Sequence, residues 1–131
     1  HYYEFSYKYM AKIIADIRSQ RPNTPLIIFA KSTPFSPLQM LECKPDGLGI
    51  DWQVDLRAAF ASVGDQVAIQ GNLDPAALYA DEQSLAKEVS RIMQSRDANS
   101  RHIFNLGHGI YPDVNPDRVA YLVDAVHNYP G

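Results

Sequence analysis

Apolar positions near the start of the chain fall first on a helical spacing and then into a continuous run. The apolar residues of segment 3–20 recur every four positions and form one stripe: Phe5, Tyr9, Ile13 and Ile17. This spacing predicts a helix that buries the stripe, and the two prolines of segment 21–25 end it. The run 26–30 (LIIFA) has no polar interruption, which is typical of a strand buried on both faces.

Helical and strand patterns continue to alternate along the chain. The further predicted strands are 48–50, 66–70 and one that contains Ile103 and Phe104. A short helix is expected at 35–41, with Ser32 or Thr33 before it and the turn 45–47 after it. The next helix is closed by a glycine and is marked by these residues: Leu56, Ala59, Phe60, Val63 and Gly64.

The last two helices carry clear start signals. Asp81 is a good N-cap, because its side-chain oxygen can accept hydrogen bonds from free amides of the first turn. The inner face of that helix is predicted to be Leu85, Val89, Ile92 and Met93. Asn115 is expected to cap the last helix, with Pro116 at its first position. The apolar stripe of this helix is Val119, Leu122, Val123 and Val126.

One leading helix followed by four βα units predicts an α/β fold with a parallel sheet. A complete (β/α)8 TIM barrel takes roughly 250 residues, so a single domain over 1–131 has the size of half a barrel. A small open doubly wound sheet is the structural alternative. Because ligand groups gather at the carboxyl ends of parallel strands, the residues that follow the strands should share one rim: Lys31, Asp51-Trp52, Gly71-Asn72 and Gly107-His108.

Composition narrows the classes of function. The 131 residues have a formal net charge of −3 and no basic stripe, so nucleic acid is not an expected partner. The apolar runs are far too short to span a membrane, and no signal peptide is visible. The single cysteine, Cys43, cannot form an internal disulfide, which fits a reducing compartment, and a cytoplasmic location is expected. The absence of an initiator methionine suggests a fragment or a processed product.

His108 is the strongest candidate for chemistry. It lies between Gly107 and Gly109, directly after the fourth predicted strand, and glycines on both sides leave the imidazole uncrowded. An imidazole at a sheet rim can hold an anionic group or deliver a proton. The structural alternative is a histidine bonded to a loop carbonyl. A metal site with His102 and Asp113 is not expected, since the spacings fit no compact metal signature.

Four other polar residues near the predicted rim have a functional and a structural interpretation. Asp51 could orient a catalytic group, but a helix cap beside the rim aromatic Trp52 is favoured. Asp74 has a turn and cap signature, and the structural interpretation is also favoured for Asn72. Lys31 could pair with a ligand carboxylate, although a solvated or ion-paired structural lysine is favoured.

Three motifs resemble those of uroporphyrinogen decarboxylases, in the order and spacing of that family. They are 47–52 (GLGIDW), 70–79 (QGNLDPAALY) and 104–110 (FNLGHGI), and 123–127 (VDAVH) is similar to the family's closing helix. The resemblance covers essentially the whole chain and corresponds to the C-terminal portion of the family's polypeptide. It therefore favours the C-terminal half of a TIM barrel. In one departure from many relatives, Lys31 is followed by Ser-Thr-Pro-Phe instead of an open, glycine-rich turn.

The resemblance implies a cofactor-free enzyme, commonly a homodimer, with a tetrapyrrole substrate. The family converts the four acetate side chains of uroporphyrinogen III to the methyl groups of coproporphyrinogen III in haem biosynthesis. Its arginine-rich segment and essential aspartate lie upstream and match no position here, so this chain alone is expected to be inactive. The histidine of the motif Asn-Leu-Gly-His-Gly, here His108, is the expected catalytic and substrate-binding residue. No metal is expected.

Two alternatives to this function remain open on the sequence. The first is a relative with the same barrel, such as a corrinoid methyltransferase. Those enzymes usually bind zinc through His and Cys at the rim. The position of Cys43 in a helix-to-strand connection disfavours this alternative. The second is a non-enzymatic α/β domain that binds a small anion or a partner. A half-barrel would expose its inner face and two strand edges, so self-association, or cover from further chain, is expected.

Overall fold

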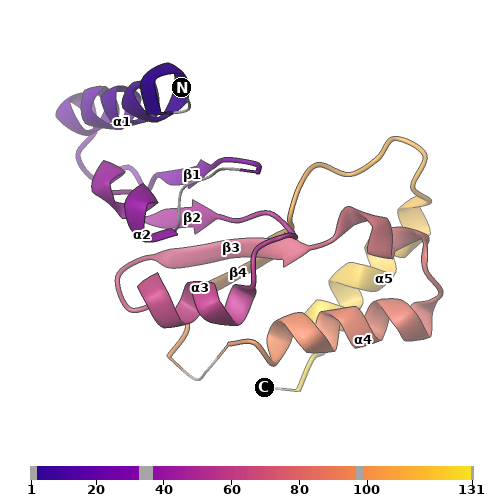
Figure 1. Ribbon diagram of the computed structural model, residues 1–131. Helices are drawn as coiled ribbons and strands as arrows, with labels where there is room; N and C mark the ends of the chain where they lie inside the picture. The colour runs from indigo at the N-terminus through magenta and orange to yellow at the C-terminus, as the bar shows by residue number, and fades with distance from the viewer. Residues whose placement is uncertain (1–2, 33–36, 97–98, 131) are drawn as a thin grey trace.

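Four parallel strands form one sheet in which strands adjacent in sequence are also neighbours in space. The computed structural model describes residues 3–32, 37–96 and 99–130. The strands are β1 (Ile27–Phe29), β2 (Gly47–Gly49), β3 (Ala68–Leu73) and β4 (His102–Leu106), in the order β1-β2-β3-β4 (Figure 1). A doubly wound sheet reverses its strand order at a switch point, and this sheet does not. The order is that of successive strands in part of a (β/α)8 barrel.

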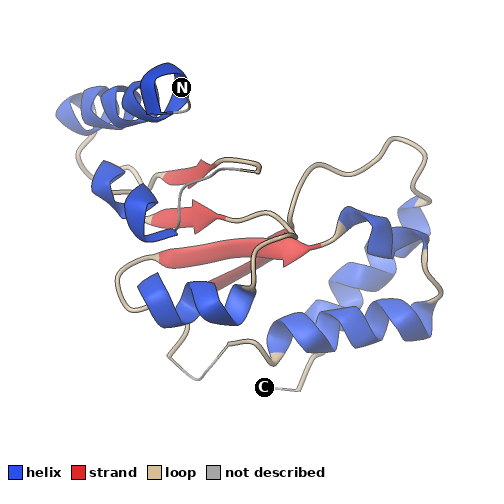
Figure 2. Cartoon of the chain, in the orientation of Figure 1, coloured by secondary structure: helices blue, strands red, loops and turns tan. Residues whose placement is uncertain are grey.

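Helical segments connect the strands (Figure 2). A π-helical turn, η1 (Tyr3–Tyr7), leads into α1 (Lys8–Gln20), and α2 (Pro37–Met40) continues into the 3₁₀ turn η2 (Leu41–Cys43). After these come α3 (Leu56–Val63), the 3₁₀ turn η3 (Pro75–Tyr79), α4 (Glu82–Met93) and α5 (Pro116–His127). The predicted alternation of helices and strands is confirmed, and α1 lies at the opposite end of the molecule from α4 and α5 (Figure 1). Within the described residues, no helix is long and apolar enough to cross a lipid bilayer.

The core lies on one face of the sheet. Ile28, Leu48 and Ile69 are aligned by the strand register and are all buried. Because side chains alternate between faces along a strand, their neighbours Ile27 and Phe29 point to the opposite face. The prediction that residues 26–30 form a strand buried on both faces is wrong: Ile27 and Phe29 are 45% and 43% exposed.

This second face of the sheet is apolar and open. The register aligns Phe29 with Gly49, Gln70 and Ile103 in one row across all four strands, and Ile103 is 43% exposed. The glycine of β2 in this row leaves space for an aromatic neighbour: a Cβ at Gly49 would lie 3.1 Å from the Phe29 side chain. In a closed barrel this face would line the interior.

Helix α1 uses a different face from the one its apolar spacing predicted. Phe5, Tyr9 and Ile13 are exposed, whereas Tyr7 and Ile14 are buried. The prediction of a buried Phe5–Tyr9–Ile13–Ile17 stripe is therefore wrong, although the helix itself is confirmed. The Tyr7 hydroxyl donates a hydrogen bond to Glu42 at 3.3 Å, which ties this buried face to η2.

The predicted starts of the later helices are confirmed by their capping bonds. The Asp81 carboxylate accepts a hydrogen bond from the Ser84 amide at 2.7 Å, and the Asn115 side chain accepts one from the Asp117 amide at 2.9 Å. The predicted inner face of α4 is buried or half-buried throughout. In α5, Leu122 is buried, but Val123 is 45% exposed and does not belong to the buried stripe. For the predicted helix 35–41, Phe35 and the possible cap Thr33 lie outside the described residues.

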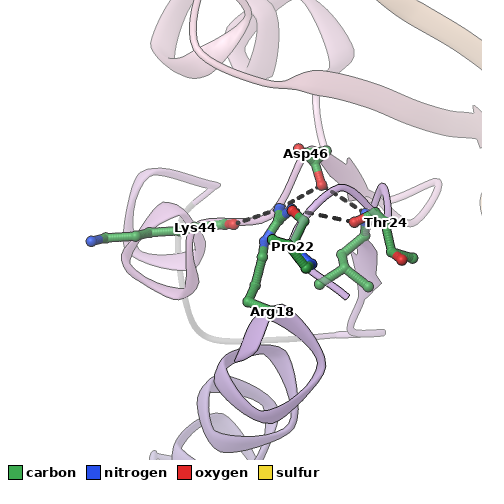
Figure 3. A network of polar contacts seen from close by, with 6 residues as sticks. Arg18, Pro22, Thr24, Lys44 and Asp46 are labelled. Atoms are coloured by element: carbon green, nitrogen blue, oxygen red, sulfur yellow. Dashed lines mark hydrogen bonds and ion pairs between the residues drawn. The ribbon is translucent and has the colours of Figure 1, made fainter. Parts of the chain in front are cut away.

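An ion pair joins α1 to the start of the sheet (Figure 3). The Arg18 guanidinium contacts the Asp46 carboxylate at 2.6 Å and also donates to the carbonyls of Pro22 and Thr24, at 3.2 Å each. The same Asp46 oxygen accepts a hydrogen bond from the Leu26 amide at 2.7 Å. These bonds hold the turn after α1 against the entry to β2.

Candidate functional site

The residues that follow the strands meet at one rim, as predicted from the sequence. Three side chains form a continuous cluster there, and each comes from the end of a different strand: Lys31, Trp52 and His108. The Lys31 Nζ lies 4.9 Å from the centre of the Trp52 ring, which is a cation–π distance. The His108 ring lies 6.0 Å from the Trp52 ring in an edge-on arrangement. We call these three residues the rim cluster.

His108 is presented to solvent instead of being held by the protein. Its ring is exposed, and its aromatic neighbours are Trp52 and Phe29, the latter 6.3 Å away between ring centres. Among the described residues, the imidazole has no hydrogen-bond partner, so the structural alternative of a histidine bonded to a loop carbonyl is not what the structure contains. Both ring nitrogens are available to a ligand.

A buried carboxylate fixes the loops beneath the rim cluster. Asp51 is 3% exposed, and its two oxygens accept hydrogen bonds from the amides of Ser32, at 2.7 Å, and Gln53, at 2.9 Å. One bond therefore holds the turn after Lys31 and the other holds the turn after Trp52. The expectation that Asp51 caps a helix is wrong: Asp55 is the N-cap of α3, through the Ala58 amide.

Asn72 braces the same loop from β3. It is 2% exposed, and its side-chain amide donates to the carbonyls of Asp51, at 2.9 Å, and Val54, at 2.7 Å. These bonds confirm the structural role expected for Asn72. The predicted cap at Asp74 is also confirmed, since its carboxylate accepts a hydrogen bond from the Ala76 amide at 2.9 Å.

The two glycines that flank His108 have different roles. A Cβ at Gly107 would overlap the backbone of Asp51 and Trp52, with the Asp51 carbonyl carbon only 2.9 Å away. Gly107 is therefore required for the close approach of the His108 loop to the β2 loop. A Cβ at Gly109 would meet no atom within 4 Å. The sequence suggested that both glycines leave room around the imidazole, whereas one of them packs against protein backbone.

A cavity of about 740 Å³ opens beside His108. Its wall combines the open face of the sheet with the inner side of α5, including Phe29, Gln70, Asn105, Val126 and His127. It has the size of a small-molecule site, and most of its lining is apolar with a few polar groups, as is usual for such sites. His127 belongs to the motif 123–127, but the sequence alone did not identify it as a residue of this cavity.

His102 has a structural role that sequence reasoning missed. It begins β4, as expected, and its Nε2 lies 2.6 Å from the Gly71 carbonyl. Burial is the main cause that lowers the pKa of His102, so the ring is neutral near pH 7 with its proton on Nε2. This bond joins β4 to β3 just before Asn72. The only signal in the sequence was the position of a polar residue at the start of an apolar strand.

The arrangement offers no metal centre in the part of the chain that the structure describes. No group of three or more His, Cys, Asp or Glu side chains there is arranged to hold an ion. Asp113 accepts a hydrogen bond from the Tyr79 hydroxyl at 2.6 Å, and Cys43 is buried in η2. The three residues weighed as a metal site, His102, His108 and Asp113, are not brought together.

Comparison with known proteins agrees with this fold. A family model described as uroporphyrinogen decarboxylase (URO-D) matches residues 1–129. Uroporphyrinogen decarboxylases of Vesicomyosocius okutanii and Nitrosococcus oceani are 44% and 45% identical to the chain over 128 residues, which is 98% and 96% of its length. The protein of Hahella chejuensis is 43% identical over 129 residues, or 96% of the chain.

These alignments also show how much of each relative is matched. The chain covers 37% of the Vesicomyosocius protein and 36% of the other two. A sheet with the strand order of a partial (β/α)8 barrel fits that share. With a family match over nearly all of its residues, the chain belongs to the uroporphyrinogen decarboxylase family.

Proposed function

We propose that this chain forms the C-terminal part of a uroporphyrinogen decarboxylase and supplies His108 to its active site. The observation that carries the proposal is the position of His108: the histidine of the family-like motif lies exposed at the carboxyl end of β4, beside a cavity of about 740 Å³. Ligands of (β/α)8 enzymes bind at this end of the strands. The names of the relatives supply the substrate class, a tetrapyrrole that carries several carboxylates.

The proposed reaction replaces one carboxylate by one proton at each acetate side chain. Protonation of a pyrrole ring carbon makes the ring an electron sink. The bond between the acetate methylene and its carboxylate then breaks, the electron pair enters the ring, and CO₂ leaves. The methylene carbon takes up a proton and becomes a methyl group, while the ring carbon returns its own. The reaction so described is that of a lyase and needs no cofactor.

His108 has two roles in this proposal. A ring N–H donates a hydrogen bond to a substrate carboxylate, where a charge-assisted bond is stronger than a neutral one. Imidazole is also a side chain that commonly exchanges protons in enzymes, so it can hold and return a proton near the reacting carbon. The Trp52 and Phe29 rings limit where the imidazole can point, because they contact it from the loop after β2 and from β1.

The remaining features of the proposal follow from the family and not from the site. We propose a cytoplasmic enzyme that acts as a homodimer, in which the principal catalytic carboxylate comes from a part of the polypeptide outside these 131 residues. A methyltransferase with a zinc–cysteine centre is disfavoured, because the single cysteine, Cys43, is buried in η2 and not at the rim.

The test is a product assay on the full-length protein that contains this chain. Uroporphyrinogen III is incubated anaerobically with the protein, and the porphyrins formed after oxidation are separated by chromatography. We expect coproporphyrin, preceded by intermediates that have lost one, two and three carboxylates. The 131-residue chain alone is expected to form no product. Absence of any decarboxylated product from the full-length protein would contradict the proposal.

A further inference from the structure

Lys31 presents a cationic group on the same aromatic ring that His108 contacts. Its ammonium lies over the Trp52 indole at 4.9 Å, and the His108 ring lies 6.0 Å from that indole. The distance from the Lys31 ammonium to the His108 ring is therefore at most the sum of these two distances. Within residues 3–32, 37–96 and 99–130, no carboxylate lies within ion-pair distance of Lys31. Of the two structural roles expected for Lys31, solvated or ion-paired, the ion-paired role therefore has no partner in these residues.

The backbone that carries Lys31 is held in place from below. The next residue, Ser32, adopts a left-handed conformation with φ of 49°, and its amide donates to the buried Asp51 carboxylate at 2.7 Å. Trp52 follows Asp51 directly in the chain. One buried carboxylate therefore fixes both the turn that carries the lysine and the aromatic ring beneath its ammonium. The contact of the ammonium with this ring restricts a long side chain that would otherwise have many rotamers.

We propose that Lys31 is a second carboxylate-binding residue of this site and that Trp52 is the positioning residue that aligns it with His108. The ligand chemistry is a polycarboxylate in which two carboxylates lie close enough to meet the ammonium and the imidazole together. This inference rests on the proposed function for the nature of the substrate. Lys31 contributes binding of the carboxylate that is not being removed, while His108 serves the reacting end.

The test measures binding separately from catalysis in the full-length protein. Uroporphyrin, the oxidised and stable ring with the same carboxylates, is titrated by fluorescence against wild type, Lys31→Met, Lys31→Arg and the control Lys87→Met, a lysine exposed on α4. We expect Lys31→Met to raise Kd about tenfold, the loss of about 1.4 kcal/mol, with a weaker dependence of Kd on salt. Lys31→Arg should restore most of the affinity, and Lys87→Met should bind as wild type does.

The kinetic signature of a binding residue is also distinctive. In decarboxylation assays, Lys31→Met should raise KM about tenfold and change kcat less than twofold, since the interaction is the same in ground state and transition state. A Kd for Lys31→Met equal to that of wild type would overturn the proposal. If the wild type forms no product, the proposed function fails, but the titration still decides whether Lys31 binds carboxylates.

A double-mutant cycle tests the role of Trp52. If Trp52 positions the ammonium, replacing Lys31 by Met in a Trp52→Leu background should change Kd much less than it does in wild type. Trp52→Phe, which keeps an aromatic face, should retain more of the Lys31 effect than Trp52→Leu. Equal effects of the lysine substitution in all three backgrounds would show that Trp52 has only a packing role.

Discussion

Gly107 illustrates, at the scale of single residues, how a short motif combines packing with chemistry. Residues 104–110 resemble a family motif that contains the candidate site residue His108. The glycine before His108, however, is needed for close packing against the backbone of Asp51 and Trp52. The imidazole itself is exposed, and its ring neighbours among the described residues are the aromatic side chains Phe29 and Trp52. The sequence could identify His108 through its motif, but not the role of Asp51, because one hydrogen bond of this carboxylate reaches 19 residues back along the chain to Ser32.

Gly107→Ala should destabilise the protein, whereas Gly109→Ala should not. The added methyl group at position 107 overlaps the backbone of the β2 loop, and relief of such overpacking costs about 1–3 kcal/mol. At position 109 nothing lies within 4 Å of the added carbon, so a change within about 0.5 kcal/mol is expected. Urea unfolding of both variants measures the difference. Equal stability of the two variants would contradict the close approach seen at Gly107.

At the scale of elements, the type and order of the helices and strands were predictable from the sequence, but the face that each helix buries was less predictable. Start signals such as Asp81 and Asn115 correctly marked α4 and α5, because a cap depends on residues within one turn. The leading helical segment, η1 and α1, has apolar residues on two faces, and spacing alone does not say which face is buried: Tyr7 and Ile14 are buried, and Ile13 is exposed. The outcome depends on contacts with η2, which lies far along the sequence.

The attachment of α1 to the sheet should depend on pH through Asp46. Hydrogen bonds from the Leu26 amide and Arg18 lower the pKa of Asp46 below its ordinary value of 3.8. A carboxylate with a lower pKa in the folded state stabilises the fold fully above that ordinary value, and this contribution is lost as pH falls through the lower, folded-state pKa. The Asp46→Asn variant lacks this titration and loses the ion pair with Arg18.

Thermal unfolding between pH 2.5 and 7 tests the role of Asp46. Wild type should be more stable than Asp46→Asn at pH 7, and the difference in Tm should shrink below about pH 4 as the carboxylate is protonated. Asp65→Asn, a change at an exposed aspartate without a side-chain hydrogen bond among the described contacts, serves as the matched control and should show no such convergence. A difference in Tm between wild type and Asp46→Asn that stays constant with pH would refute the stabilising role of the Asp46 carboxylate.

At the scale of the whole molecule, the open face of the sheet is the main departure from a self-contained domain. Ile27, Phe29 and Ile103 are each more than 40% exposed on that face, and β1 and β4 have unpaired edges within the described sheet. The alternation of strands and helices predicted the parallel sheet, and the sequential strand order decides between part of a barrel and a doubly wound sheet. The strand order itself could not be deduced from the sequence, because it depends on where each helix crosses the sheet.

The 131-residue chain should self-associate in isolation. Exposed apolar side chains beside unpaired strand edges favour contact between copies. Sedimentation velocity over a range of concentrations should show species larger than the 14.7 kDa monomer, and Phe29→Lys should shift the distribution toward monomer. Tyr9→Lys, at an exposed aromatic residue of α1 away from this face, is the matched control. A monomer at all concentrations would contradict the expectation.

The most direct test of the account is the activity of the His108→Asn variant of the full-length protein with uroporphyrinogen. Asparagine keeps one hydrogen-bond donor but cannot hold or return a proton. Because the ring is exposed, the variant should unfold at the temperature of the wild type. We predict a loss in kcat/KM of about 100-fold or more, with the fold unchanged. A kcat/KM within twofold of wild type would show that His108 is not part of the decarboxylase site.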